Sequence, residues 1–240
     1  MPKLTIFFAL LMLVSLASGC AFFRPAEVPI ASEYYHYQPS NSTLIVLLHG
    51  RGGAATNFVR YGAVEQIMTC QPRANILAVD SHFGYYRERI IEERLREDII
   101  KPARDNGTRQ VWILGISMGG LGSLVYRQRY PEDIEAVILM APYLGEWDEL
   151  GEYVKNPQLA RQSGDPDFVE IWDALTTIPV DNPAITLAFG EDDDNNNQHR
   201  WIASLLDDSR VVSGPGAHNW NAWSKLWPEA LNRSGLCDVS

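Results

Sequence analysis

Five short and unbroken runs of apolar residues divide the chain. They are Leu44–Leu48, Ile76–Val79, Val111–Leu114, Ala136–Met140 and Ile185–Phe189. Each run has four or five residues, which is too short for a helix, and none alternates with polar residues. Strands that are buried on both faces of a parallel sheet have this pattern. The runs therefore predict the central strands of such a sheet.

Segments with the period of helices lie between these runs. They include Arg87–Arg104, Leu121–Tyr130 and Trp201–Leu206. In the first, apolar side chains lie on one face and Glu and Arg on the other, and Pro102 is expected to kink or stop the helix. The aromatic segment Tyr34–Tyr37 predicts an edge strand. Alternating strands and helices predict an α/β fold, with a mostly parallel sheet covered on both faces.

The N-terminus has the pattern of a signal peptide. Lys3 precedes the apolar stretch Leu4–Leu16, which is shorter than the ~20 residues of a membrane-spanning helix. The stretch ends in Ala17-Ser18-Gly19-Cys20, which resembles the lipobox of bacterial lipoproteins, with Ala17 where Leu is usual. That resemblance implies removal of residues 1–19, lipidation of Cys20 and export to the periplasmic or cell-surface side of a membrane. An ordinary cleaved signal, with Cys20 uninvolved, is the alternative.

Composition narrows the classes of function. The 240 residues are 46% hydrophobic, so the chain is too apolar to be disordered, and its length suits one domain. A net charge of −10 argues against a basic face for nucleic acid or anionic lipid. Three cysteines are too few for a disulfide scaffold, and pairing of Cys70 with Cys237 is left open. The spacings of metal ligands and of a phosphate-binding loop are missing from the sequence, so we expect no cofactor and no metal.

A candidate nucleophile follows the third apolar run. Gly115-Ile116-Ser117-Met118-Gly119 is a G-x-S-x-G sequence, with a strand pattern directly before it and a helix pattern directly after it. In that setting the motif forms a sharp turn that exposes the serine Oγ above the sheet, and its glycines avoid clashes with neighbouring backbone. A glycine-rich turn without catalytic meaning is the alternative.

A serine at neutral pH needs a base, and the base needs an acid to orient it. His218 lies in a loop after Val211-Val212, beyond the last expected strand. The fifth run is followed by the carboxylates Asp192, Asp193 and Asp194, one of which we expect to be the acid. The chain order serine, acid, histidine is that of α/β-hydrolases.

The turn after the second expected strand, His49-Gly50-Arg51, is a candidate oxyanion hole. A tetrahedral intermediate carries a negative oxygen, which backbone N–H groups stabilise. We expect one donor from Met118 N–H and another from the Gly50-Arg51 turn, with Arg51 N–H favoured. His49 is expected to brace this loop.

From about Tyr34 to Leu231 the chain resembles a serine esterase of the α/β-hydrolase superfamily. Gly115–Gly122 and the Gly216–Trp223 segment around His218 are similar to the esterase group that includes feruloyl, tributyrin and S-formylglutathione esterases. The resemblance implies an α/β-hydrolase fold over residues 34–240. Its pattern of a glycine followed three residues later by the acid favours Asp193, although three consecutive aspartates depart from the usual single acid.

The remaining segments complete the predicted organisation. Residues 20–33 are expected to be a tether, and residues 141–183 a short cap over the site. The expected activity is hydrolysis of small or medium acyl esters through an acyl-enzyme on Ser117. An acyltransferase and a non-catalytic surface lipoprotein with the same fold remain alternatives. The expected partners are a small-molecule ester and, through the lipid, a membrane; the oligomeric state is left open.

Overall fold

The computed structural model describes residues 24–238, so the predicted signal peptide and Cys20 lie outside it. Within that part of the chain, one sheet has seven strands in the order β1-β3-β2-β4-β5-β6-β7. The strands are β1 Ser32–His36, β2 Thr43–Leu48, β3 Ala74–Val79, β4 Gln110–Ile116, β5 Ala136–Met140, β6 Ala184–Gly190 and β7 Val211–Gly214. Only β1 is antiparallel to its neighbour. The predicted fold class, strands and edge strand are confirmed.

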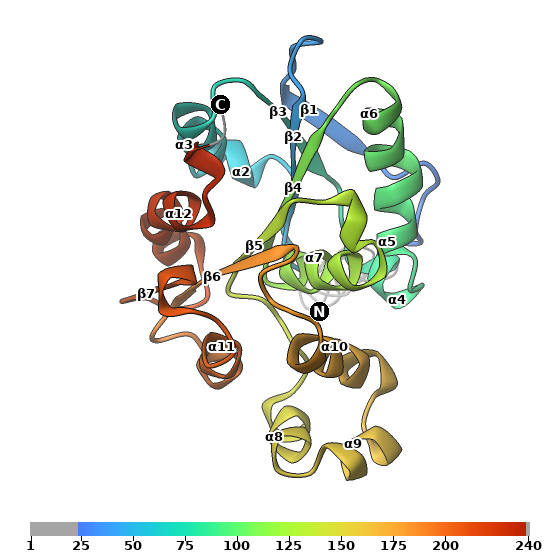
Figure 1. Cartoon of the computed structure of the whole chain (residues 1–240), viewed down its shortest axis with the longest axis vertical. Coiled ribbons are helices and arrows are strands. Elements are labelled where there is room, and N and C mark those ends of the chain that lie inside the picture. The colour runs from blue at the N-terminus through green and yellow to red at the C-terminus, as the bar shows by residue number, and fades with distance from the viewer. Residues whose placement is uncertain (1–23, 239–240) are drawn as a thin grey trace, which may run out of the picture.

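Helices cover both faces of this sheet (Figure 1). The helices of the described residues are α2 Asn57–Arg60, α3 Ala63–Cys70, α4 Phe83–Arg87, α5 Ile91–Arg94, α6 Lys101–Asp105, α7 Met118–Arg129, α8 Trp147–Lys155, α9 Pro157–Ser163, α10 Pro166–Thr177, α11 Asn196–Ala203 and α12 Trp220–Ser234. Helices α3 and α12 lie on one face, and α4 to α7 on the other. The strands between them are buried along almost their whole length because both faces are covered.

The helix predicted over Arg87–Arg104 is different in the structure. Arg87 ends α4, and the chain turns at Arg89, whose φ is 56°. A helical segment then runs from Ile91 to Asp105, with a π-helical part at Leu95–Ile100. The wider turn lets Leu95, Ile99 and Ile100 all face the core. Pro102 does not stop this segment: it lies near the start of α6, directly after the π-helical part, and the helix continues to Asp105.

Helix α11 also differs from its prediction. It begins at Asn196 and ends at Ala203, instead of covering Trp201–Leu206. The polar residues at its start gave no apolar periodicity, yet Gln198 and His199 are buried.

The described part of the predicted tether packs against the body of the protein. Arg24 forms an ion pair with Asp80 at 2.5 Å, and the side chain of Ile30 is 3% exposed. The Ile30 N–H donates to Asp98 Oδ2 at 2.8 Å, and β1 begins at Ser32. This segment is therefore fixed to the sheet and to the helical segment beside it.

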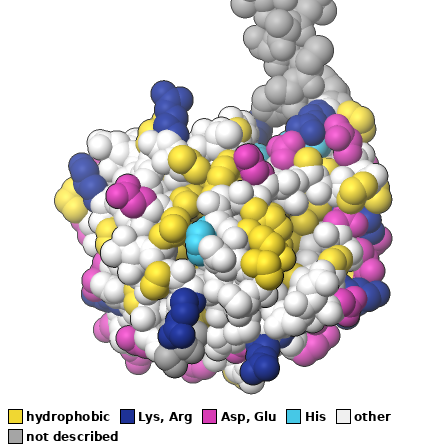
Figure 2. Space-filling view, turned by 90° about the horizontal axis from the view of Figure 1, so that it is seen from above, with side chains coloured by type: hydrophobic (Ala, Val, Ile, Leu, Met, Phe, Trp, Pro, Cys, Tyr) yellow, Lys and Arg dark blue, Asp and Glu magenta, His cyan; other side chains and the backbone are white. Residues whose placement is uncertain are grey.

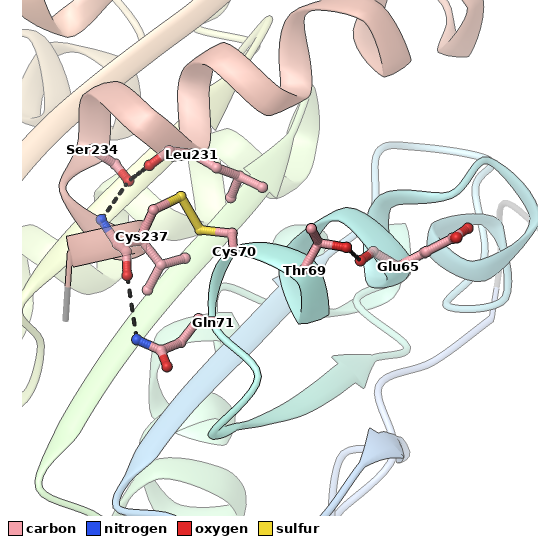
Figure 3. Close-up of a disulfide and its surroundings, with 8 residues drawn as sticks. Glu65, Thr69, Cys70, Gln71, Leu231, Ser234 and Cys237 are labelled. Atoms are coloured by element: carbon pink, nitrogen blue, oxygen red, sulfur yellow. Dashed lines mark hydrogen bonds between the residues drawn. A yellow bond between two sulfur atoms is a disulfide. The ribbon is translucent and has the colours of Figure 1, made fainter. Parts of the chain in front are cut away.

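Cys70 and Cys237 form a disulfide (Figure 3). It joins the end of α3 to the short turn after α12, across 167 residues of sequence. The Gln71 side chain donates to Leu236 O at 3.4 Å beside it. The question that the sequence left open is thus settled in favour of a bridge.

Exposed aromatic side chains lie on the edge strand β1 and directly after it. Tyr34 and Tyr37 are 45% and 52% exposed, and their ring centroids are 4.8 Å apart. Figure 2 views the molecule from the top of Figure 1 and shows hydrophobic side chains near the middle of that face, with charged ones around its rim.

Among residues 24–238, no helix has the length and hydropathy that a membrane span requires.

Candidate active site

Ser117 lies at the sharp turn between β4 and α7. Its backbone has φ 53° and ψ −116°, a conformation that side chains rarely adopt and that costs about 1–3 kcal/mol. The neighbouring glycines make the turn possible, because a Cβ on Gly119 would lie 2.1 Å from Leu48 O and one on Gly115 would lie 2.2 Å from Gly119 O. The strand, turn and helix predicted from the G-x-S-x-G sequence are all present.

Ser117 is hydrogen-bonded to His218, and His218 to Asp193. His218 Nε2 lies 2.9 Å from Ser117 Oγ, and His218 Nδ1 lies 2.7 Å from Asp193 Oδ2. A carboxylate only accepts hydrogen bonds, so Nδ1–H donates to Asp193 and Nε2 is left to accept the Ser117 O–H. The side chain of His218 is 26% exposed and that of Asp193 is fully buried. His218 is therefore partly open to solvent, while Asp193 is shielded from water.

Asp193 follows β6 and differs from its two neighbours. Burial acts to raise the pKa of Asp193, but hydrogen bonds from His218 and from Asn195 N–H outweigh it, so the pKa is lowered. The carboxylate is thus charged at neutral pH. Asp192 is exposed and its Oδ2 accepts from Gly216 N–H at 3.1 Å, while Asp194 is exposed. Of the three candidate acids, only Asp193 contacts His218 in the described structure.

The turn after β2 lies against the serine. A Cβ on Gly50 would be 3.0 Å from Ser117 Cβ, so this backbone approaches the nucleophile as closely as a glycine allows. His49 is 2% exposed and its Nδ1 donates to Gly50 O at 2.8 Å. The Arg51 guanidinium lies 5.5 Å from the ring centroid of Phe83. The structure therefore places Gly50 beside Ser117, and Met118 follows Ser117 as the first residue of α7.

Asp80 contacts the ring nitrogen of His49 that faces away from Gly50 O. Asp80 Oδ1 lies 3.4 Å from His49 Nε2, and Asp80 Oδ2 lies 2.5 Å from Arg24 Nη1. The hydrogen bond from His49, aided by Arg24, lowers the pKa of Asp80 to about 2 against the opposing effect of burial. Asp80 is therefore a charged anchor for His49.

The segment predicted as a cap, 141–183, contains α8, α9 and α10. These helices lie together at the lower end of the molecule in Figure 1. Their buried side chains form a small core of their own, with Leu150, Tyr153, Ala160, Val169 and Trp172. The aromatic side chains of Tyr153 and Trp172 thus pack these helices together.

Sequence reasoning missed three residues on the helices that follow Asp193 and His218. Trp223 of α12 is 7% exposed, and its indole meets the His218 ring edge-on, with centroids 5.0 Å apart. Gln198 and His199 are 2% and 0% exposed and lie on the helix that follows Asp193. Only the position of α11 directly after the acid could have drawn attention to them. Among the described residues, no group of three or more His, Cys, Asp or Glu side chains is arranged to hold a metal ion.

Comparisons with known proteins bear on the fold. The family model for serine aminopeptidase, S33, matches residues 95–199. A ferulic acid esterase is 14% identical over 87% of this chain and 97% of its own, with a TM-score of 0.60. The chain has the α/β-hydrolase fold. An S-formylglutathione hydrolase from Staphylococcus aureus (15% identity, 88% and 98% coverage, TM-score 0.56) and a monoacylglycerol lipase from Paleococcus ferrophilus (14%, 88% and 99%, 0.58) have the same fold. A comparison with curated protein sequences found no match.

Proposed function

We propose that this protein is a serine hydrolase that cleaves carboxylic esters through an acyl-enzyme on Ser117. The observation that carries the proposal is the pair of hydrogen bonds that join Ser117 Oγ, His218 and Asp193 at 2.9 and 2.7 Å. A buried acid, a half-buried base and a serine on a strained turn give each group the environment that its role requires.

The reaction follows from these contacts. His218 Nε2 takes the proton of Ser117 Oγ as the oxygen attacks the ester carbonyl, and the charged Asp193 stabilises the imidazolium. His218 then gives this proton to the leaving alcohol, and the acyl group remains on Ser117. A water molecule, deprotonated by His218, attacks the acyl-enzyme, and the carboxylic acid leaves as Ser117 regains its proton.

The negative oxygen of each tetrahedral intermediate needs donors. We assign them to Met118 N–H at the start of α7 and to Arg51 N–H in the turn that Gly50 holds against Ser117. One such donor contributes about 2.7–4 kcal/mol to the stability of the transition state. His49 and Asp80 keep the Gly50 carbonyl, and with it this turn, in place.

Small and medium acyl groups are the substrates that we propose. The segment over residues 141–183 forms short helices of 7 to 12 residues and no large lid. Two of the structural neighbours carry the names of an esterase and a lipase, which is consistent with an ester substrate.

Labelling with a fluorophosphonate probe tests the activity. We expect the wild type to be labelled and to hydrolyse p-nitrophenyl acetate or butyrate, while Ser117→Ala is not labelled and loses on the order of 10³-fold or more in kcat. Ser163→Ala, an exposed serine of α9, is the matched control and should behave as the wild type. A wild-type protein that neither reacts with the probe nor hydrolyses any chain length would show the proposal to be wrong. Product analysis with an added alcohol separates hydrolysis from acyl transfer.

We also propose that the protein is exported and held on a bacterial membrane by lipid on Cys20. The support is the sequence Ala17-Ser18-Gly19-Cys20 after an apolar stretch. Cell fractionation tests it: Cys20→Ser should move the protein from the membrane to the soluble fraction, whereas Cys70→Ser should not. Unchanged fractionation of Cys20→Ser would rule out the anchor.

A further inference from the structure

The loop between β5 and α8 is hydrogen-bonded to the turn that carries Ser117. Tyr143 N–H donates to Ser117 O at 3.0 Å, and Ser117 N–H donates to Met140 O at 2.9 Å. The backbone of Ser117 is thus fixed on both sides by this one segment. A strained conformation persists only where its surroundings hold it, so the position of Tyr143 N–H bears on the position of Ser117 Oγ.

This loop is itself in an unusual conformation. Ala141 has φ 46° and Gly145 has φ 85°, and both lie in the left-handed region. Ala141 is not a glycine, so its conformation costs free energy that contacts outside the loop must supply. Ala141 N–H donates to Ala188 O at 2.7 Å, which secures one end of the loop on β6.

Two buried polar side chains of α11 hold the remaining part of the loop between β5 and α8. Gln198 accepts from Leu144 N–H at 3.4 Å and donates to Gly145 O. His199 Nε2 lies 3.1 Å from Pro142 O. A carbonyl only accepts, so Nε2 carries the hydrogen. Three backbone groups that flank Tyr143, on Pro142, Leu144 and Gly145, are therefore held by two adjacent residues of one helix.

The protonation state of His199 suits this role. Burial lowers its pKa to about 4, although the charge of Asp193 opposes the shift, so the ring is neutral at pH 7. Its Nδ1 is buried without a hydrogen-bond partner in the described structure, which agrees with a neutral ring that carries its hydrogen on Nε2. The Phe189 ring packs against the imidazole of His199, with the two ring centroids 5.3 Å apart.

The same helix also holds the acid. Asn195, at the N-cap of α11, donates its N–H to Asp193 Oδ1 at 2.8 Å. Resting on the proposed function, we propose that Gln198 and His199 are positioning residues, which place Ser117 through the backbone of Pro142–Gly145 in register with Asp193. Helix α11 thereby links the acid and the nucleophile, which lie 76 residues apart in the sequence.

The test compares His199→Met, His199→Gln and Ile202→Val. Methionine fills the space but removes the donor to Pro142 O, whereas glutamine places an N–H donor at a similar reach. We expect kcat for p-nitrophenyl butyrate to fall about 10- to 100-fold in His199→Met with KM within about threefold, because the nucleophile is displaced and ground-state binding is not. His199→Gln should recover most of this loss.

Ile202→Val is the matched control for a merely structural effect. Ile202 lies on the same helix and is 0% exposed, but it is not among the residues that hold the loop. We expect a fall in Tm of about 2–4 °C, with kcat unchanged. Equal losses of kcat in Ile202→Val and His199→Met, at equal Tm, would overturn the positioning role.

A second readout does not depend on activity. Hydrogen exchange of peptides that cover residues 141–146 should be at least about tenfold faster in His199→Met than in the wild type, and unchanged in Ile202→Val. Unchanged exchange in His199→Met overturns the inference. If the wild type proves to hydrolyse no ester, the proposed function fails, and the exchange result still decides whether His199 holds the loop.

Discussion

Asp192 and Asp193 are adjacent carboxylates with different contacts. Asp193 accepts from His218 Nδ1–H inside the protein, while Asp192 accepts from Gly216 N–H at the surface. Asp193→Asn should lower kcat by roughly 10³- to 10⁴-fold, because an amide no longer favours the tautomer with hydrogen on Nδ1. Asp192→Asn keeps an acceptor for Gly216 and should cost less than about fivefold. Steady-state kinetics on one ester at pH 7 measures both.

Equal losses in the two variants would contradict this assignment of the acid. The variants are closely matched, since each replaces one carboxylate oxygen by an amide NH2 group within the same turn. Circular dichroism and Tm of both proteins control for misfolding. A large loss confined to Asp192→Asn would move the acid by one residue.

The individual site residues that the sequence predicted are those with a local signal. Ser117 stands in a short motif, and His218 follows from chain order. Asp193 lies among three aspartates, so its selection depended on the spacing from Gly190 that a resemblance supplied. His199 was beyond prediction, because its partner is a backbone carbonyl, Pro142 O, more than fifty residues away.

Elements differ in how well their pattern predicts them. The strands were predicted closely because burial on both faces leaves an unbroken apolar run. The bounds predicted for Ala136–Met140 are those of β5 in the structure. The helix over Arg87–Arg104 was not, since a positive φ at Arg89 and a π-helical turn at Leu95–Ile100 have no signature in a 3.6-residue period. Helix α11 was predicted too far along the chain, because its first turn is polar although Gln198 and His199 in it are buried.

The same elements explain why the site is assembled where it is. Ser117, Asp193 and His218 follow β4, β6 and β7, whose parallel carboxyl ends meet at one edge of the sheet. That edge was predictable from the order of the elements. The distances across it were not, because they depend on the loop contacts between 141 and 145.

The disulfide between Cys70 and Cys237 fixes the turn after α12 to the end of α3. This pairing could not be decided from the sequence, since nothing local brings two residues 167 apart into contact. The contact arises from the packing of α12 against α3, which only the assembled sheet defines.

Removing this bridge should lower stability more than activity. A closed loop of this length restricts the unfolded chain, and loss of a native disulfide typically costs about 2–5 kcal/mol. For a chain of this size that corresponds to a fall in Tm on the order of 10 °C in the Cys70→Ser/Cys237→Ser variant. Activity at 25 °C should stay within about twofold, because neither cysteine contacts the residues of the proposed triad in the described structure.

The single variants supply the control. Cys70→Ser and Cys237→Ser each break the same bond, so each should lose nearly as much as the double variant, and the effects should not add. Treating the wild type with a reductant should give the same fall in Tm, and leave the double variant unchanged. Additive losses, or a wild type whose Tm is insensitive to reductant, would show that the bridge does not stabilise the fold and that the two side chains act only by packing.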